Sequence, residues 1–306
     1  LKKKFNIEFS VICSSTKLNI TKTYYLDEIK CTCISKKILI NSSIKKNKTI
    51  KALINRIVFW REFIFFISYF LRTRKKIDLI HVVGKNNITT SAVIISKIFK
   101  IPLIVELVNY TQNPNYYQPL LLNLFLAKSY RENTLIICIS KYLEKLCRQH
   151  KIYNTWHRPN PVDEEMFNLN YNSISKKELF GFNEKDKVIL QLAKFMPLKN
   201  QTFMLNVLEN LPNEYKLVLV GPVDHTGVHK VRDLNYINEL KDMIDKLKLN
   251  SRILLDMTFT KTPEKFMKAC DVFVIPSKNE GLSTVMLEAL SCGKPVITNK
   301  LGSVFD

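Results

Sequence analysis

Short apolar runs recur along the whole chain, and each ends in polar residues that precede a helix-like pattern. In the first half, the runs at 6–15, 77–84, 102–109 and 134–140 are expected strands. Apolar positions within 89–100 recur at intervals of three and four residues, which is the spacing of one helix face. This alternation of strands and helices predicts a parallel sheet covered by helices.

The second half repeats this plan with longer runs of Val, Ile and Leu. Expected strands occupy 187–193, 215–221, 251–257, 271–276 and 294–299, and expected helices occupy 200–210, 233–248, 263–269 and 284–292. Near-continuous apolar runs are typical of strands that are buried on both faces. The second half is therefore expected to form a parallel sheet with helices on both sides.

The apolar rhythm stops between the two halves, where proline, asparagine and charged residues accumulate. We therefore expect an N-terminal domain at 1–162, a linker at 163–186 and a C-terminal domain at 187–306. The predicted fold class is α/β, with two doubly wound Rossmann-like parallel-sheet domains that face a cleft. Ligands of such sheets bind outside the carboxyl ends of the strands. Each half lacks an expected outer part, so the sequence is predicted to be a piece of a longer chain.

The formal charge of +20 on 306 residues raises the question of a polyanionic partner. Lysine and asparagine are abundant together with isoleucine, phenylalanine and tyrosine, whereas the chain has only 7 glycines. An A/T-rich coding sequence would impose this skew without any binding function. Nucleic acid is therefore not an expected partner, although a basic nucleic-acid-binding protein remains an alternative. A membrane surface remains a possible partner.

The 7 cysteines are odd in number and scattered, which is not the pattern of a secreted disulfide fold. We therefore expect a reduced, cytoplasmic setting. Cys31 and Cys33 are expected to be strand residues rather than zinc ligands, because no second pair follows at ligand spacing. His225 and His229 lie in a polar stretch and are expected to belong to a solvated loop.

The most apolar stretch, at 57–72, is interrupted by Arg61 and Glu62. Its uninterrupted part is shorter than the roughly 20 residues that a spanning helix needs. We favour a helix packed on a sheet. The alternative is an aromatic amphipathic helix that rests on lipid.

A strand, a polar loop and a helix follow one another at 272–299, and the loop and the helix each carry an acid, Glu280 and Glu288. Ser283 or Thr284 can cap the helix with its hydroxyl. The expected buried stripe consists of Val285, Met286, Ala289 and Leu290. Gly293 and Pro295 are expected to end the helix.

The start of this helix carries N–H groups without intrahelical partners, around Gly281, Leu282, Ser283 and Thr284. Such a helix start favours an anion, and a diphosphate would fit it. Each of the two carboxylates can accept two hydrogen bonds at once, which suits the paired hydroxyls of a sugar. An anion site flanked by two carboxylates predicts a nucleotide sugar.

The same stretch resembles the signature of the retaining glycosyltransferases of group 1, also called family 4, which have the GT-B fold. That signature has two glutamates separated by seven residues within an ordered context. The positions that match in order are Pro276, Ser277, Glu280, Gly281, Leu287, Glu288, Ala289, Gly293, Pro295, Val296 and Ile297.

Other stretches are similar to the family as well. Residues 192–200 resemble its strand-loop with two cations that hold the donor diphosphate, and these cations would be Lys194 and Lys199 here. Residues 160–163 resemble the family's Asn-Gly-Val-Asp at the crossover. In many members a histidine stands near the reacting sugar, at the position of Val108, with Asn109 next to it.

The resemblance implies transfer of a sugar from a nucleotide-sugar donor to the hydroxyl of a saccharide or lipid-linked acceptor, with retention of configuration. By this analogy Glu280 holds the donor sugar and is the catalytic residue, and Glu288 holds the ribose. Gly281, Leu282, Ser283 and Thr284 would contact phosphate or sugar. No cofactor or metal is expected, since the sequence has no Asp-X-Asp triplet.

Two further classes of protein are weighed against this enzyme. A non-catalytic glycosyltransferase-like binding subunit is the alternative that Val108 favours, and it predicts donor binding without turnover. An NAD-dependent enzyme is disfavoured, because no Gly-X-Gly-X-X-Gly turn follows any expected strand.

Overall fold

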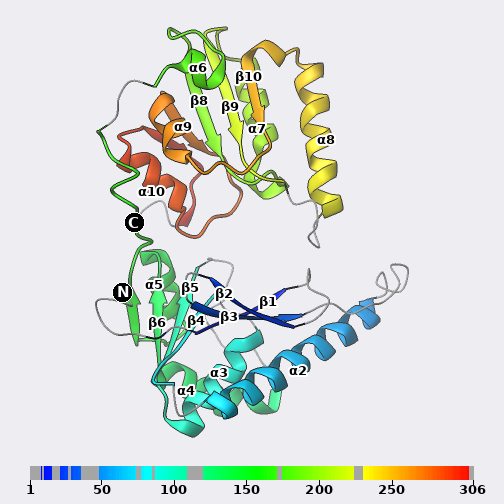
Figure 1. Cartoon of the computed structure of the whole chain (residues 1–306), viewed down its shortest axis with the longest axis vertical. Helices are drawn as coiled ribbons and strands as arrows, with labels where there is room; N and C mark the ends of the chain where they lie inside the picture. The colour runs from blue at the N-terminus through cyan, green and yellow to red at the C-terminus, as the bar shows by residue number, and fades with distance from the viewer. Residues whose placement is uncertain are drawn as a thin grey trace. The chain divides into compact units, whose positions relative to one another are not determined.

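The computed structural model describes residues 8, 10–15, 21–26, 29–35, 48–73, 77–84, 87–108, 120–170, 174–223 and 230–302. The chain forms two compact units (Figure 1). One unit comprises Leu1–Glu106, Asn115–Ile136 and Thr226–Val228, and the other comprises Leu107–Pro114, Ile137–His225 and His229–Asp306. Asn109, His225 and His229 lie outside the described residues. The domain limits that the sequence suggests stay a prediction.

Five parallel strands form the sheet of the second half. They are β8 (Lys187–Leu192), β9 (Tyr215–Val220), β10 (Ile253–Asp256), β11 (Val272–Ile275) and β12 (Val296–Thr298). Their order is β10-β9-β8-β11-β12, and each neighbouring pair is parallel. The chain starts at the central strand, runs outward to β10 and returns to β11 beside β8. The strand order therefore reverses between β8 and β11, and ligands bind at this kind of switch point.

Helices cover both faces of this sheet (Figure 1). They are α6 (Lys176–Phe180), α7 (Gln201–Glu209), α8 (Lys230–Lys246), α9 (Pro263–Ala269) and α10 (Thr284–Ser291). Alternate residues of β8 enter different cores, since Val188 and Leu190 pack with α9 and α10 whereas Ile189 packs with α7 and α8. The strands are apolar throughout because both of their faces are buried, which confirms the expectation from sequence.

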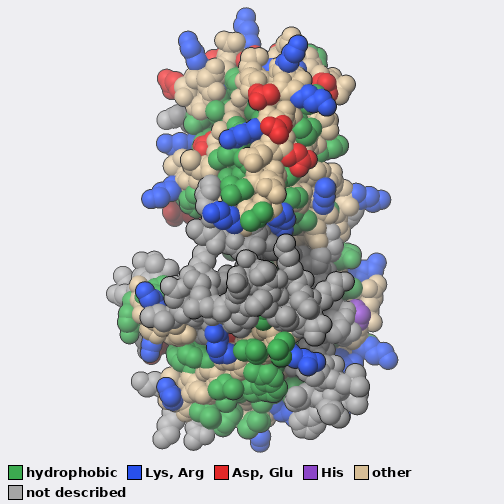
Figure 2. Space-filling model, turned by 90° about the vertical axis from the view of Figure 1, so that its right-hand side faces the viewer, with side chains coloured by type: hydrophobic (Ala, Val, Ile, Leu, Met, Phe, Trp, Pro, Cys, Tyr) green, Lys and Arg blue, Asp and Glu red, His purple; other side chains and the backbone are tan. Residues whose placement is uncertain are grey.

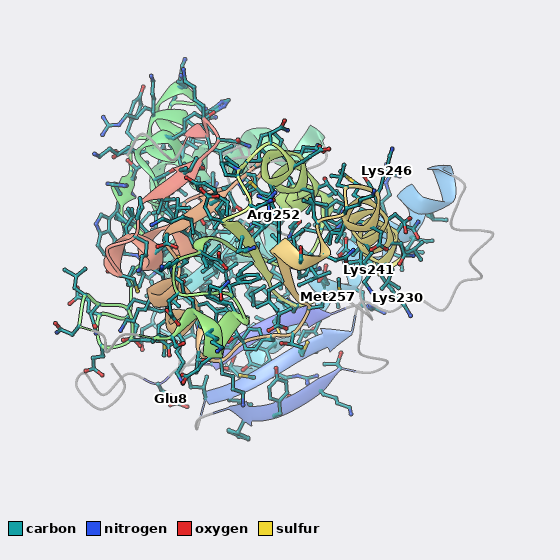
Figure 3. The ribbon with its side chains drawn as sticks, turned by 90° about the horizontal axis from the view of Figure 1, so that it is seen from above. Glu8, Lys230, Lys241, Lys246, Arg252 and Met257 are labelled. Atoms are coloured by element: carbon teal, nitrogen blue, oxygen red, sulfur yellow. The ribbon has the colours of Figure 1, made fainter. Side chains whose placement is uncertain are left out.

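Part of the expected linker at 163–186 packs against this sheet. Phe167 and Phe180 are each 5% exposed and belong to the core under α9 and α10. Lys176 pairs with Asp271 at 2.8 Å, and Asp271 also accepts a hydrogen bond from the backbone of Val188. At the amino ends of β9 and β10, Arg252 donates to the carbonyl groups of Leu211, Pro212 and Tyr215 and fixes the turn before β9 (Figure 3).

Two smaller sheets occupy the first half. One contains β4 (Ile80–Val83), β5 (Leu103–Leu107), β6 (Thr134–Cys138) and β7 (Thr155–His157) in that order. The other contains β1 (Ser10–Ser15), β3 (Ile29–Ser35) and β2 (Lys22–Leu26). The first-half helices are α2 (Lys48–Thr73), α3 (Asn87–Phe99), α4 (Leu120–Asn133) and α5 (Lys141–Gln149).

Strand β2 departs from the parallel order that the sequence predicts. It pairs antiparallel with β3, from Lys22 opposite Cys33 to Leu26 opposite Ile29. Only residues 27 and 28 connect the two strands, and a parallel crossover needs a dozen residues or more. Cys31 and Cys33 lie in β3 and are each 6% exposed, so they are buried strand residues as expected.

The expected helix at 57–72 is confirmed and belongs to the longer helix α2. Its inner face carries Phe66 and Phe70, which are 8% and 2% exposed, and the ring of Phe70 lies 5.0 Å from that of Phe99 in α3. Packing on α3 therefore accounts for one face of α2. Among the described helices, none combines the length and the apolar character that a membrane span requires.

Candidate donor-binding site

The loop after β8 brings Lys194 and Lys199 to the switch point. A short 3-10 helix, η3 (Pro197–Lys199), ends at Asn200, which has φ 58° and ψ 39°. This left-handed conformation is one that glycine and asparagine tolerate better than other residues. It gives a physical reason for asparagine directly after Lys199. Asn200 turns the chain directly from η3 into α7.

Buried amide side chains hold this loop in place. Gln191 of β8 donates to the carbonyl of Lys199 at 2.8 Å, and Gln201 of α7 donates to the carbonyl of Lys194 at 3.0 Å. Tyr236 of α8 donates in turn to the side chain of Gln201 at 3.1 Å. The backbone of both lysines is therefore fixed by hydrogen bonds from the elements around it.

The loop after β11 is bound to the β8 loop. The backbone N–H of Lys278 donates to the carbonyl of Leu198 at 2.9 Å. The side-chain amides of Asn200 and Asn299 both donate to the carbonyl of Pro276, at 3.2 and 2.9 Å. Because the two loops are joined, Lys199 and the acid of the β11 loop keep a fixed relation.

Glu280 lies against Lys199 of the β8 loop. Its Oε1 pairs with Lys199 Nζ and accepts a hydrogen bond from Ser277 Oγ at 2.8 Å. The side chains of Lys199 and Glu280 are 22% and 16% exposed, so the pair is screened only partly by water. The positive charge of Lys199 is thus balanced by Glu280.

Lys194 has a different acidic neighbour. Its Nζ lies 3.2 Å from Asp233 Oδ2, and Arg232 Nη2 lies 2.7 Å from the other oxygen of Asp233. Asp233 is fully buried, whereas the side chain of Lys194 is 33% exposed. The buried carboxylate therefore anchors the ammonium group at the edge of the site.

A cavity of about 430 Å³ lies at the carboxyl ends of β8 and β11. Four of the expected site residues line it, namely Lys194, Lys199, Glu280 and Glu288. Gly281, Leu282, Ser283 and Thr284 are not among its lining residues in the described part of the chain. The structure thus brings the charged groups together and places the start of α10 beside them. The roles assigned to these residues stay predictions.

Glu288 lies inside α10, next to the apolar part of the cavity. Burial disfavours the charged carboxylate and raises the pKa of Glu288 above its ordinary value. Val285, one helical turn earlier, lines the same cavity. A ligand hydroxyl that donates to Glu288 would compensate part of this desolvation.

The start of α10 differs from the expected capped helix. Ser283 occupies the N-cap position, but within the described residues its side chain makes no capping hydrogen bond. The hydroxyl of Thr284 instead accepts a hydrogen bond from Asn160 at 3.2 Å, and Asn160 also donates to the carbonyl of Leu282. The expected hydroxyl cap is therefore wrong, because the Thr284 hydroxyl lies one position inside the helix and bonds to another segment.

The expected buried stripe of α10 is correct except at its end. Ala289 is fully buried, and Val285 and Met286 pack against the same core, but Leu290 is 52% exposed. Helix α10 ends at Ser291, so Leu290 lies in its last turn.

Gly293 ends α10 as expected. Its φ is 68°, its N–H donates to the carbonyl of Leu290 at 2.9 Å, and the N–H of Lys294 donates to the carbonyl of Ala289 at 3.0 Å. These two hydrogen bonds form the Schellman motif, in which the left-handed residue is usually glycine.

Two glycines allow close backbone approach at the site. A Cβ on Gly281 would lie 2.4 Å from the carbonyl oxygen of Val108, and a Cβ on Gly221 would lie 2.0 Å from that of Ala193. Gly221 follows β9 and lines the cavity, yet sequence reasoning missed it. Its position directly after an apolar run, in a glycine-poor chain, was the available signal. The other lining residues that were missed include Pro222, Phe259, Thr260 and Pro263.

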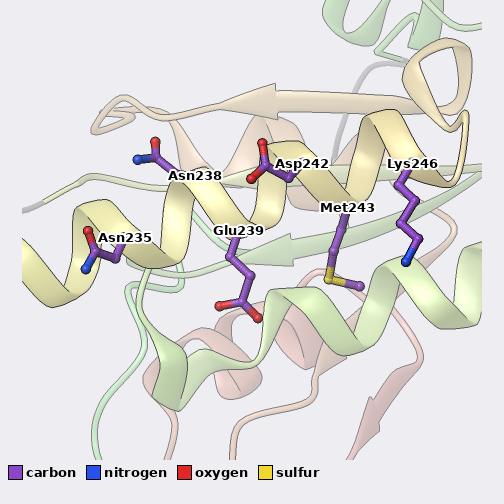
Figure 4. Close-up of a pocket in the computed structure, with 6 residues that line it drawn as sticks. All are labelled: Asn235, Asn238, Glu239, Asp242, Met243 and Lys246. Carbon is purple, nitrogen blue, oxygen red and sulfur yellow. The ribbon is translucent and has the colours of Figure 1, made fainter.

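A second hollow, of about 450 Å³, lies along α8 (Figure 4). All of its lining residues belong to that one helix, namely Asn235, Asn238, Glu239, Asp242, Met243 and Lys246. Among the described residues, its lining contains none from the carboxyl end of a strand, where doubly wound sheets bind their ligands. We therefore place the candidate site at the switch point and not on α8.

A doubly wound sheet with a ligand cavity at its switch point is typical of nucleotide-binding α/β domains. Residues 173–306 match the family model described as "Glycosyl transferases group 1". These residues, somewhat less than half of the chain, thus form a domain of the group 1 glycosyltransferase family.

Curated relatives are also glycosyltransferases. Over 129 residues the chain is 31% identical to the N-acetylgalactosamine-N,N'-diacetylbacillosaminyl-diphospho-undecaprenol 4-alpha-N-acetylgalactosaminyltransferase of Campylobacter jejuni, with 42% of this chain and 32% of that protein covered. Over 239 residues it is 26% identical to the O-antigen biosynthesis glycosyltransferase WclY of Escherichia coli, with 74% and 62% covered. The chain therefore spans less than two thirds of the length of these relatives.

Solved structures show the same fold. Anabaena Alr3699/HepE in complex with UDP aligns with a TM-score of 0.66 at 24% identity, covering 78% of this chain and 64% of that one. The sucrose-phosphate synthase of Thermosynechococcus elongatus aligns with a TM-score of 0.67 at 14% identity, covering 96% and 72%. The fold is thus the Rossmann-like α/β fold of GT-B glycosyltransferases, as the sequence predicts.

Proposed function

We propose that this protein transfers a sugar from a nucleotide-sugar donor to a hydroxyl of a saccharide or lipid-linked acceptor, with retention of configuration. The observation that carries the proposal is the shared cavity at the switch point, which combines Lys194 and Lys199 with Glu280 and Glu288. Two ammonium groups, with the start of α10 beside them, suit a diphosphate. Two carboxylates suit the hydroxyls of the ribose and the donor sugar of a nucleotide sugar.

The comparisons support the class of donor and acceptor. One structural neighbour was solved in complex with UDP, and the name of one relative describes a diphospho-undecaprenol substrate. Lys194 and Lys199 supply the positive charge that lines the proposed site, so we propose donor binding without a metal or another cofactor. The cytoplasm is the proposed compartment.

In the proposed reaction, the bond between the anomeric carbon and the diphosphate oxygen breaks, and its electron pair stays on that oxygen. The acceptor oxygen bonds to the same face of the anomeric carbon, and its proton passes to the departing diphosphate. Lys194 and Lys199 would stabilise the charge that develops on the diphosphate. Glu280 would orient the donor sugar, and Glu288 would accept hydrogen bonds from the ribose.

The Lys199–Glu280 pair suggests how a donor would bind. A phosphate that approaches Lys199 brings a second anion to an ammonium group already paired with Glu280. The donor would therefore loosen this ion pair and release Glu280 towards the sugar hydroxyls, while Ser277 remains its hydrogen-bond donor. Binding of the phosphate and positioning of the sugar would in this way be coupled.

Calorimetric titration of the full chain with UDP, GDP and ADP, and then with their sugar derivatives, tests the proposal. Lys194→Met should weaken nucleotide binding by roughly 10 to 100 fold, because a hydrogen bond to a charged group contributes about 1.5 to 3 kcal/mol. Lys241→Met removes an exposed lysine of α8 and should leave affinity unchanged (Figure 3). If none of the nucleotides shows saturable binding, the proposed site is contradicted.

A turnover assay separates the enzyme from a binding subunit. Val108 stands where many members of the family have histidine, which favours a non-catalytic protein as the second candidate. Saturable donor binding without release of nucleoside diphosphate, in the presence of lipid-linked and saccharide acceptors, would establish the second candidate. Release of nucleoside diphosphate that depends on an acceptor would establish the first.

A further inference from the structure

Helix α2 carries an apolar stripe on the face that does not pack on α3. The stripe consists of Leu53, Ile57, Trp60, Ile64 and Leu71, which are 57%, 50%, 51%, 60% and 50% exposed. These positions follow one another at helical spacing, so their side chains lie along one line of the helix. From Leu53 to Leu71 the line is about 27 Å long, at 1.5 Å per residue.

The stripe is more than a set of scattered surface residues. In Figure 2 hydrophobic side chains gather on one face of the part of the molecule that holds α2, with Lys and Arg side chains around them. A contiguous exposed apolar area of this kind marks an interaction surface in most soluble proteins. Trp60 packs against aromatic neighbours. The centroid of its ring lies 5.6 Å from that of Phe59 and 5.4 Å from that of Phe63, and both pairs are edge-to-face.

The charges beside the stripe are cationic. Arg56 and Arg72 are exposed, whereas Glu62, the one acid in the sequence of α2, is 1% exposed and lies on the inner face. Apolar side chains with an interfacial tryptophan and flanking arginines are typical of helices that lie in the headgroup region of a bilayer. An anionic lipid surface is complementary to this face in both polarity and charge.

A second copy of the chain is a less suitable occupant. Two α2 helices packed along the stripe would bring Arg56 and Arg72 of each copy close to like charges, and the exposed surface of α2 offers no described acid to balance them. A bilayer that contains anionic lipids supplies that balance. Each basic residue near such a surface adds to the electrostatic attraction.

We propose that the stripe of α2 docks on an anionic lipid surface, with Trp60 at the level of the headgroups and Arg56 and Arg72 on lipid phosphates. The purpose of this docking rests on the proposed function, because a protein held at a bilayer can reach an acceptor that is itself anchored in lipid. Docking needs only α2, and the donor cavity is not involved.

Tryptophan fluorescence of the full chain gives a direct test. The sequence has 2 tryptophans, Trp60 and Trp156, and both are 51% exposed. In Trp156→Phe the emission reports Trp60 alone, and in Trp60→Phe it reports Trp156 alone. With vesicles of phosphatidylcholine and phosphatidylglycerol, Trp60 should shift to shorter wavelength and be quenched by brominated chains, whereas Trp156 should do neither. Pure phosphatidylcholine vesicles should give a smaller shift, and added salt should reduce it.

A charge placed on the stripe supplies the matched control. In the Trp156→Phe background, Ile57→Asp with Ile64→Asp should weaken vesicle binding at least about tenfold, because two carboxylates must then enter the interface. Val231→Asp, at a position on α8 that is 70% exposed, should leave binding unchanged. Circular dichroism confirms that each variant is folded.

Two results would overturn the proposal. One is an emission of Trp60 that stays constant up to high lipid concentration. The other is a dimer in analytical ultracentrifugation that Ile57→Asp with Ile64→Asp dissociates, which would assign the stripe to a second copy. Nucleotide titration of the same variants separates this outcome from a failure of the proposed function, since the stripe and the donor cavity share no residue.

Discussion

Replacement of Gly221 by alanine should damage the donor site through the backbone alone. The added Cβ would lie 2.0 Å from the carbonyl oxygen of Ala193 and 2.6 Å from its carbonyl carbon. Cβ atoms essentially never approach other atoms closer than 3.0 Å, so the ends of β8 and β9 would have to separate by about 1 Å. Both contacts are to backbone, and no side chain can rotate away to relieve them.

The loss of folding stability in Gly221→Ala can be estimated from the contacts that such a separation strains. The N–H of Ala193 donates to the carbonyl of Val220 at 2.9 Å, and the N–H of Phe195 donates to that of Pro222 at 3.1 Å. Each hydrogen bond contributes about 1 kcal/mol, and overpacking typically costs about 1 to 3 kcal/mol. The free energy of unfolding should therefore fall by about 3 to 5 kcal/mol in Gly221→Ala.

Gly181→Ala is the matched control. Gly181 has φ +74° at the end of α6, and no atom lies within 4 Å of its added Cβ. Only the left-handed conformation is then penalised, which costs about 1 kcal/mol. At about 2 to 4 °C per kcal/mol, the melting temperature should fall by roughly 6 to 20 °C in Gly221→Ala and by only about 2 to 4 °C in Gly181→Ala.

Thermal unfolding by circular dichroism and titration with UDP, both on the full chain, check this reasoning. Lys194 directly follows Ala193, so Gly221→Ala should also weaken nucleotide binding, at least about tenfold, at temperatures where it is folded. Gly181→Ala should bind as the parent does. This prediction is refuted if the two variants lose the same stability or if Gly221→Ala binds nucleotide normally. In either case, glycine at 221 would not be required for the close approach of β8 and β9.

Three further predictions concern single side chains of the site. Glu288→Gln should weaken nucleotide binding but raise the melting temperature near neutral pH by about 1 °C. Burial raises the pKa of Glu288, so the folded state binds the carboxyl proton of Glu288 more tightly than the unfolded state does. The folded state therefore loses stability as pH rises from the ordinary pKa to the raised one. The gain in melting temperature of Glu288→Gln should vanish in melts at acidic pH. Glu280→Ala should lower turnover of the donor more than its affinity in steady-state kinetics, and equal losses of both would argue against its role at the sugar. Asn200→Gly and Asn200→Ala both remove the hydrogen bond to the Pro276 carbonyl, but Asn200→Ala should lose about 1 kcal/mol more in urea unfolding, because alanine resists φ 58°. Equal stability of the two variants would contradict the conformational explanation.

Local sequence predicted the elements of the second half well. The strand after 187 and the strand before Pro276 are continuous apolar runs, and both occur as β8 and β11 within a few residues of the expected limits. Gly293 also ended its helix as expected, since a left-handed C′ residue is a local requirement. Such features depend on neighbours in the sequence and can therefore be read from it.

Strand pairing in the first half was harder to predict. The sequence rhythm suggested parallel strands, but it did not identify β2 or its antiparallel pairing with β3. The direction of pairing depends on which surface is available to each strand, and a short exposed strand has no strong apolar pattern to signal it. The five residues of β2 include exposed Tyr24 and Tyr25.

Within the site, the sequence identified the residue types but not their partners. Glu280 was expected to face a sugar, and in the structure it pairs with Lys199 and Ser277. Asp233 and Gln191 were missed, because α8 and the interior of β8 gave no motif that points to the loops they support. Those contacts join segments far apart in the chain, and periodicity carries no information about them.

The sequence by itself determined the alternation of strands and helices and the charged residues at the strand ends, since each follows from local apolar pattern and turn chemistry. Only the tertiary structure decided that β11 lies beside β8, so that Lys194, Lys199, Glu280 and Glu288 line one cavity. The same holds for α2, where packing on α3 selected which apolar face is buried and which remains exposed. The physical reason is that burial of an apolar surface is non-directional, and its partner is chosen by the fit of whole elements.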